Sequence, residues 1–202
     1  MSGTIEGTDG KPRCGWSASA PEFQAYHDKE WGFPVADDQR LFEKLCLESF
    51  QSGLSWRTIL AKRANFRRAF HQFDYRKVAG FDASDVERLL QDAGIVRHRG
   101  KIEAVINNAK RMAELVATEG SLTAYVWRFE PKQSELGEPL TQSVSPASIA
   151  MSKDLKKRGW AFVGPTTVFA FMQAMGLIND HAKGCVIREE ARQARVGFNK
   201  PV

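Results

Sequence analysis

The chain has 202 residues, enough for one domain with at most a small appendage. Hydrophobic residues make up 43% and charged residues 26%, an ordinary globular composition that excludes disordered, collagen-like and coiled-coil chains. The 29 Lys and Arg residues outnumber the 24 Asp and Glu residues, and the net charge of +5 allows a polyanionic partner without requiring one. Three cysteines are too few for a disulfide framework, so we expect a reducing, cytoplasmic setting.

The two ends of the chain predict tails around one domain. Residues 1–12 are polar and glycine-rich, contain no apolar segment of the signal-peptide kind, and predict a flexible N-terminal tail. We expect a single globular domain over residues 13–189 and a C-terminal tail over 190–202. The uncharged run over residues 159–179 is long enough to span a bilayer, but its Gly164–Pro165 pair predicts a turn followed by a buried helix. We therefore expect no membrane partner.

Apolar residues recur at helical spacing through most of the chain. In chain order, the sequence predicts a helix capped by Asp37–Asp38 and running to Phe50, a helix from Trp56 to Phe70, a helix that starts at a Ser84–Glu87 capping box and stops at Gly94, a helix over 99–116, a short helix over 122–129, a loop over 130–147, a helix over 148–158, and a helix that starts at Pro165. No alternating run is long enough to predict a sheet, so the expected fold class is all-α.

The helix–turn–helix segment over residues 158–172 is a candidate DNA contact. We expect Gly164 to let the backbone turn without a Cβ clash. The turn can then aim backbone N–H groups and a helix N-terminus at a phosphate, with basic residues just upstream. The alternative is an ordinary helical hairpin with a solvated basic face. The candidate DNA-binding residues are Gly164, Pro165, Thr166, Lys156, Lys157 and Arg158.

Two cysteines and two histidines near opposite ends of the chain are candidate metal ligands. His181 and Cys185 lie one helical turn apart, and Cys14 and His27 could complete a tetrahedral site. Four protein ligands leave no open position for water, so such a site would be structural. The alternative is a buried thiol at Cys185 and a hydrogen-bonded histidine at position 27.

Glu48 lies at the edge of an apolar helical face, where a carboxylate needs a partner. Trp56 follows a short break, and Trp16, Phe23 and Tyr26 belong to an aromatic-rich N-terminal region. An acid ringed by flat side chains can hold a planar heterocycle by stacking and by hydrogen bonds to its edge. The alternative is that these aromatic residues are core and that Glu48 reaches solvent.

A set of long motifs occurs together between residues 13 and 185: Arg13–Trp16, Tyr26–Gly32, Leu45–Trp56, Asp92–Ile102, Lys156–Gly159, Phe162–Gly164, Phe171–Ala174 and Asn179–Cys185. These motifs closely resemble those of the 3-methyladenine DNA glycosylase I family. The resemblance implies a helix-hairpin-helix DNA glycosylase fold, a single structural zinc ion that joins the N- and C-terminal regions, and excision of 3-methyladenine from alkylated double-stranded DNA.

The resemblance also assigns roles to single residues. It implies zinc ligands at Cys14, His27, His181 and Cys185, a base-binding pocket with Glu48, Tyr26 and Trp56, and further aromatic walls at Trp16 and Phe23. It places the DNA-anchoring hairpin around Gly164. Phe23 stands where some members carry Tyr, and Ser49–Phe50 where others carry Gly–Gln. We expect these departures to alter the pocket wall without changing its chemistry.

The family is understood to lack the catalytic Asp of other helix-hairpin-helix glycosylases. Asp180 follows the hairpin at a similar distance, but it adjoins His181, so we expect it to support the metal site. Glu48 then carries the catalysis, and with no motif for a nucleophilic lysine we expect a monofunctional, monomeric enzyme. The alternatives are a zinc-stabilised DNA-binding module without catalysis and a zinc hydrolase, which would need an open coordination position.

Overall fold

The computed structural model describes residues 3–200, and these form a mostly helical fold. The α-helices are α1 (Pro21–Lys29), α2 (Asp38–Gln51), α3 (Trp56–Ala69), α4 (Tyr75–Val78), α5 (Ala83–Gln91), α6 (Arg99–Glu119), α7 (Leu122–Trp127), α8 (Pro146–Lys157), α9 (Pro165–Ala174) and α10 (Val186–Val196). Three short 3-10 helices lie at Gly15–Ala18, His71–Phe73 and Gln133–Glu135, and two strands, β1 (Thr4–Glu6) and β2 (Pro12–Cys14), complete the elements.

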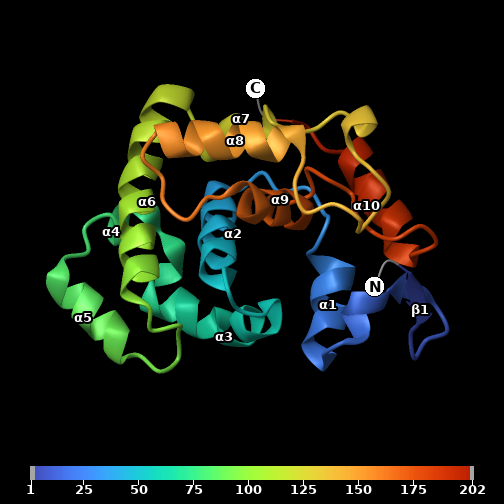
Figure 1. The fold of residues 1–202 in the computed structure, drawn as a ribbon, viewed down its shortest axis with the longest axis horizontal. Coiled ribbons are helices and arrows are strands. Elements are labelled where there is room, and N and C mark those ends of the chain that lie inside the picture. The colour runs from blue at the N-terminus through green and yellow to red at the C-terminus, as the bar shows by residue number, and fades with distance from the viewer. Residues whose placement is uncertain (1–2, 201–202) are drawn as a thin grey trace.

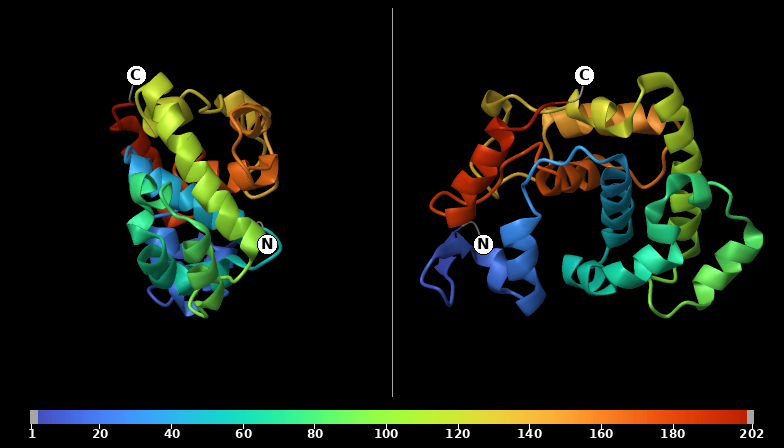
Figure 2. Two further views of the ribbon diagram at one scale, coloured as in Figure 1. Left: turned by 90° about the vertical axis from the view of Figure 1, so that its left-hand side faces the viewer. Right: turned by 180° about the vertical axis from the view of Figure 1, so that it is seen from behind.

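Helix α2 is the centre of the fold. It packs against α9 and α3, and α8 packs on the other side of α9. The long helix α6 stands at one end beside α4 and α5, while α1, β1 and α10 gather at the opposite end (Figure 1). The reverse view shows the same grouping, so the N-terminal strands and α10 lie side by side (Figure 2). The apolar face that predicts α2 is buried, with Leu41, Phe42, Leu45 and Phe50 fully inside.

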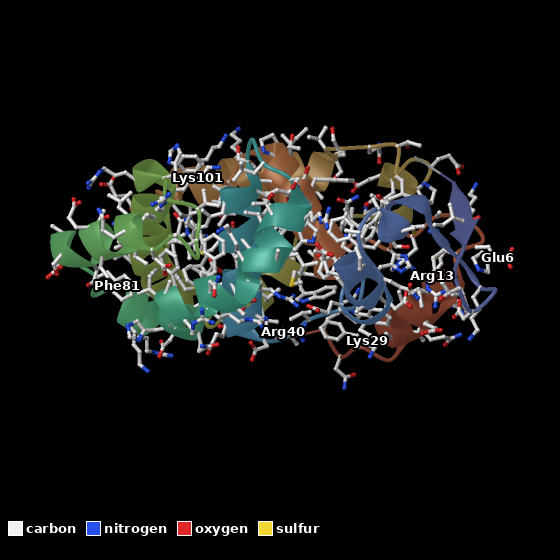
Figure 3. All side chains as sticks on the ribbon, turned by 90° about the horizontal axis from the view of Figure 1, so that it is seen from below. Glu6, Arg13, Lys29, Arg40, Phe81 and Lys101 are labelled. Carbon is white, nitrogen blue, oxygen red and sulfur yellow. The ribbon has the colours of Figure 1, made fainter. Side chains whose placement is uncertain are left out.

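The prediction of a flexible N-terminal tail over residues 1–12 is wrong for residues 3–12, the part that the structure describes. Thr4–Glu6 pairs with Pro12–Cys14 in a two-stranded antiparallel sheet, which the search for longer alternating runs missed. Arg13 ties this hairpin to the rest of the molecule, because its guanidinium pairs with Asp9 at 2.6 Å and with Asp28 at 2.9 Å (Figure 3). Residues 1–2 lie outside the described residues.

The prediction of a C-terminal tail over residues 190–202 is also wrong in its boundary. Helix α10 continues to Val196, so residues 190–196 belong to the fold. Ala191 is buried, and the ring of Phe198 lies 4.5 Å from that of Trp127 between centroids. Arg195 pairs with Glu130 at 2.5 Å. These contacts hold the segment against the end of α7, and residues 201–202 lie outside the described residues.

Helix starts differ from the prediction where a better cap lies upstream. Helix α5 is capped by Asp82, whose carboxylate accepts hydrogen bonds from the backbone N–H groups of Ser84 and Asp85. The predicted capping box of Ser84 and Glu87 is therefore wrong. Helix α8 begins at Pro146 after a Ser145–Ser148 capping box, two residues before the predicted start.

The uncharged run over residues 159–179 divides as predicted into a turn and the ten-residue helix α9, and a second turn follows the helix. Gly176, with φ +77°, sits in that second turn, and a Cβ there would lie 2.4 Å from the backbone of Phe33 and Pro34. Within residues 3–200, no helix combines the length and apolar character needed to cross a membrane.

Candidate active site

A cavity of about 320 Å³ opens between α1, α2, α3 and α9. This volume falls within the range of small-molecule sites, about 300–1,000 Å³. Its lining residues are Trp16, Phe23, Tyr26, Trp31, Glu48, Gln51, Trp56, Leu140, Ala170 and Gln173. All five residues predicted for the base pocket are therefore brought together around one space, although they come from three separate segments of the chain.

Glu48 lies at the wall of this cavity with only 5% of its surface exposed, so it does not reach away into solvent. Its Oε1 lies 2.6 Å from Nζ of Lys44, one helical turn earlier on α2. The same Nζ donates a hydrogen bond of 2.7 Å to the hydroxyl of Tyr26 and lies 3.4 Å from the ring centroid of Trp56. Sequence reasoning missed Lys44, although i,i+4 spacing from Glu48 was a signal for an ion pair.

Burial and neighbouring charge together shift the pKa values of Lys44 and Tyr26. Burial lowers the pKa of Lys44, while the neighbouring Glu48 carboxylate acts in the opposite direction. Burial also raises the pKa of Tyr26 well above its usual value, and the negative charge of Glu48 adds to the effect. The phenol is therefore protonated at neutral pH and can donate a hydrogen bond.

The aromatic walls of the cavity stand at angles to one another. The rings of Tyr26 and Trp56 lie 5.4 Å apart between centroids at 42°, and Trp16 meets Phe23 edge-on at 5.8 Å. The indole nitrogen of Trp56 is buried and has no hydrogen-bond partner in the described part of the chain. Such an orphaned donor is costly unless a ligand or water satisfies it. Trp31 joins the walls as a further aromatic residue.

Next to the cavity, three of the four predicted metal ligands meet. Cys14, His27 and Cys185 are buried, and their ligand atoms all lie within 4.8 Å of one another. The thiol of Cys14 and the ring of His27 hold the pKa of Cys185 below its usual value, which favours a thiolate. This is the donor set of a soft divalent metal.

His181 lies beside this cluster but outside the set that meets within 4.8 Å. Its ring stands edge-on to that of His27 at 4.9 Å between centroids. Burial lowers the pKa of His181 to about 4, so the ring is neutral, and its Nε2 has no hydrogen-bond partner among residues 3–200. A buried, neutral and unpartnered imidazole nitrogen fits a metal ligand.

The expected support of the metal site by Asp180 is wrong. Its carboxylate accepts instead from the backbone N–H of Leu140 at 3.0 Å and from the side chain of Gln173 at 2.6 Å. Both partners line the cavity, so Asp180 supports the cavity wall. The groups that face the histidine Nδ1 atoms are Asp28, at 2.7 Å from His27, and Asn179, at 3.1 Å from His181.

The predicted hairpin joins α8 to α9 and leads to the mouth of the cavity. A groove of about 310 Å³ is lined by the turn after α2 and by the first turn of α9, and it shares Glu48, Gln51 and Ala170 with the cavity. Gly164 is the N-cap of α9, and no side chain caps this helix. Its first-turn N–H groups are thus open to an anion.

Gly164 is not needed for the turn itself, which corrects the sequence interpretation. Its φ of −62° and ψ of 159° are open to any residue, and a Cβ there would meet no protein atom within 4 Å. The left-handed positions of the turn are Gly159, with φ +82°, and Phe162, with φ +55°. Gly164 therefore keeps space free on the outer side of the hairpin.

Of the predicted basic residues, Lys156 and Lys157 are exposed at the end of α8. Arg158 is not available in the same way, because it pairs with Asp154 at 2.7 Å and with Glu119 at 2.5 Å. Lys101, in the first turn of α6, donates to the carbonyl of Phe50 at 2.9 Å and so supports the end of α2 (Figure 3).

Comparison with known proteins agrees with this site. The model of the methyladenine glycosylase family matches residues 16–189. DNA-3-methyladenine glycosylase 1 of Escherichia coli (strain K12) is 51% identical over 177 residues, which make up 86% of this chain and 95% of that protein.

Solved structures show the same fold. A crystal structure of 3-methyladenine DNA glycosylase I matches with a TM-score of 0.81 at 48% identity, over 86% of this chain and 98% of that chain. A variant of 3-methyladenine DNA glycosylase I in complex with 3-methyladenine matches with a TM-score of 0.81 at 37% identity, over 87% of this chain and 97% of that chain. With these extents of agreement, the chain belongs to the methyladenine glycosylase family and is an enzyme that hydrolyses N-glycosidic bonds.

Proposed function

We propose that the protein excises 3-methyladenine from alkylated double-stranded DNA as a monofunctional glycosylase. The observation that carries this proposal is the Glu48 carboxylate, which is almost fully buried yet lies at the wall of an aromatic cavity. A flat, cationic base fits this combination of stacking surfaces and negative charge. The relatives named above carry the same substrate in their names.

DNA is held at the hairpin in this proposal. The uncapped N-terminus of α9 offers backbone N–H groups to a phosphate, and Lys156 and Lys157 add Coulomb attraction. Across the groove, Leu54 in the turn after α2 is 42% exposed. An exposed apolar side chain at such a place can wedge into the base stack and fill the space of a flipped base.

The flipped base enters the cavity between Tyr26, Trp56 and the Trp16 wall. Glu48 accepts a hydrogen bond from the exocyclic amino group, since a carboxylate has acceptors only. The indole N–H of Trp56 gains a partner on the ring of the base. In this pose the buried indole N–H of Trp56, which has no partner in the described chain, is satisfied when the base is bound.

Hydrolysis needs little from the protein, because N3-methylation already makes the base a cationic leaving group. The bond from the sugar C1′ to the base nitrogen breaks, and its electron pair goes to the base. Water adds to C1′ and loses a proton. The Glu48 carboxylate stabilises the positive charge on base and sugar in the transition state, an electrostatic effect that is strong in a site shielded from water.

A lyase step would need a lysine amine that can reach C1′. Among the described residues, no lysine lines the cavity. The nearest ammonium, that of Lys44, is only 5% exposed and lies over the Trp56 ring beside Glu48 and Tyr26. This supports the proposal that the reaction stops at the abasic site.

One structural zinc ion completes the proposal. Cys14, His27 and Cys185 would hold it with His181 as the fourth ligand, and the unpartnered Nε2 of His181 supports this assignment. When bound, zinc would stabilise the fold and take no part in the reaction, because four protein ligands leave no open position. This also argues against a zinc hydrolase.

The experiment is chromatography of the bases released from methylated DNA. We expect free 3-methyladenine above the enzyme-free control, together with an intact DNA backbone on a denaturing gel run without alkali. Absence of released base would overturn the proposed function. Strand cleavage, or a covalent protein–DNA adduct trapped by borohydride, would overturn the monofunctional assignment alone.

A further inference from the structure

Lys44 is a buried lysine at the active site that the proposed reaction does not use. It is 5% exposed and lies on α2 one turn before Glu48. Its ammonium faces Glu48 Oε1 at 2.6 Å, the hydroxyl of Tyr26 at 2.7 Å and the ring of Trp56 at 3.4 Å from its centroid. Three N–H donors thus meet three residues that all line the cavity.

An ammonium group only donates hydrogen bonds, and this fixes the roles of its partners. The hydroxyl oxygen of Tyr26 accepts from Lys44, so its own proton is left for another acceptor. In residues 3–200 the structure gives that proton no acceptor. Likewise Lys44 occupies Oε1 of Glu48, and no described group donates a hydrogen bond to Oε2. One donor and one acceptor remain free at the cavity wall.

This pattern discriminates between purines. An adenine offers an amino donor beside the N7 acceptor, whereas a guanine offers two acceptors, O6 and N7, at the same edge. A free carboxylate oxygen beside a phenolic O–H matches the adenine edge and leaves the carboxylate facing O6 of guanine. A buried polar group that the wrong ligand leaves unpaired is an effective basis for rejection.

We propose that Lys44 is a positioning residue that sets the hydrogen-bond direction of Tyr26 and Glu48 and so favours an N3-methylated adenine over an N3-methylated guanine. The inference rests on the proposed function of this cavity. Lys44 does not touch the base, because it is absent from the cavity lining. Without its ammonium, the Tyr26 hydroxyl is free to donate to Glu48 directly, which would consume both the donor and the acceptor.

The test is single-turnover excision from DNA that carries N3-methylated adenine and guanine. In Lys44→Met we expect the ratio of the adenine excision rate to the guanine excision rate to fall about tenfold. This is the effect of losing one hydrogen-bond preference of about 1.4 kcal/mol. The rate ratio of the wild-type protein should also fall at alkaline pH, where Lys44, whose pKa is lowered by burial, loses its charge, and Lys44→Met should show no such fall. The other charges that act on Lys44, Arg63 of α3 and Glu30 after α1, are present in both proteins.

A double-mutant cycle separates this role from a general loss of stability. Lys44→Met should add little to the excision defect of Glu48→Gln, because Lys44 acts through that carboxylate. Lys62→Met is the matched control: it removes a lysine that bonds the carbonyl of Ala93, and it should leave the ratio and the pH profile unchanged. Melting temperatures of all variants report the structural component.

An unchanged rate ratio with an unchanged pH profile, or full additivity in the cycle, would overturn the inference. If Lys44→Met does not fold, Lys44→Gln carries the same measurement, since an amide can accept as well as donate and no longer fixes the direction. If the wild-type protein releases no 3-methyladenine, the proposed function fails. If the wild-type protein is active and the Lys44 variants keep its selectivity, this inference alone fails.

Discussion

The cavity and the Cys/His cluster lie at the same end of the molecule, but their polar groups are arranged in opposite ways. In the cavity, the indole nitrogen of Trp56 is left without a partner in the described chain, and Glu48 is only partly paired. In the cluster, Cys14, His27 and Cys185 face one another in the interior. In the proposed function, the first arrangement is completed by a base that binds and leaves, and the second would be completed by a zinc ion that stays bound.

Two tryptophans connect the regions. Trp16 and Trp31 line the cavity, and their rings also pack against the histidines, Trp16 at 5.2 Å from His27 and Trp31 at 4.7 Å from His181 between centroids. Two walls of the cavity therefore pack directly against residues of the cluster and its neighbour His181. Damage to the cluster should spread to the cavity, whereas a change of the cavity should leave the cluster intact.

The largest effect is expected from removing the metal. Cys14→Ser, or a strong chelator, should lower the melting temperature by about 10 °C. An ion whose free concentration is about a thousand times its Kd stabilises the folded state by about 4 kcal/mol, and each kcal/mol corresponds to about 2–4 °C in a chain of this size. Excision should fall with it. Zinc analysis and thermal melting check this, and a zinc-free protein of wild-type stability and activity would break the proposed coupling.

The second-largest effect is expected from Trp56, in the wall of the cavity. Trp56→Ala should lose about 1–3 kcal/mol of stacking energy, which slows excision roughly five- to 150-fold, with unchanged zinc content. Trp56→Phe is the control, because it keeps a flat, smaller ring for stacking and removes the unpartnered N–H. Single-turnover rates of the two variants separate stacking from hydrogen bonding, and equal wild-type rates in both would remove Trp56 from the site.

The salt dependence of DNA binding should reflect the number of phosphates that the lysines of the hairpin neutralise. Replacing Lys156 and Lys157 by Gln should reduce the slope of log binding constant against log salt by up to about 1.8, because each neutralised phosphate contributes about 0.9. Lys183→Gln is the control, since it removes an exposed lysine that already pairs with Glu138 at 2.6 Å, and it should leave the slope unchanged. A slope unaffected by the double substitution would place the DNA elsewhere.

The smallest effect on stability is expected at Gly164. Gly164→Ala should change the free energy of unfolding by less than about 1 kcal/mol, because the backbone suits alanine and the added Cβ meets no protein atom. DNA binding should nevertheless weaken, since that space faces the proposed phosphate contact. Melting curves and binding isotherms of the same sample test this, and undiminished binding would show that the open space has no role in DNA contact.

Sequence patterns predict the parts of this molecule that depend on local periodicity. The buried face of α2 and the start of α9 at Pro165 follow from spacing and capping, as does the division of the uncharged run. Strands β1 and β2 escape prediction because three residues carry no measurable alternation. The Ser84 box is wrong because Asp82 is a second cap candidate two residues away.

The site is predictable in its chemistry but not in its partners. Glu48, Tyr26 and Trp56 follow from the aromatic context and the family resemblance, and they meet around one cavity. Sequence alone does not show which neighbour occupies a charged group. Arg158 therefore looks free for DNA although Glu119 and Asp154 bind it, and Asp180 looks like metal support although it holds Gln173. These pairings depend on tertiary contacts between distant segments.

The most direct test of the proposed mechanism is single-turnover excision of 3-methyladenine by Glu48→Gln. The amide keeps the shape and an acceptor for Lys44 but removes the charge that stabilises the transition state. We predict a rate lower by on the order of a hundredfold, the effect of losing one preorganised electrostatic group. Zinc content and binding to undamaged DNA should be unchanged. Excision at the wild-type rate would contradict the role of Glu48 and with it the proposed mechanism.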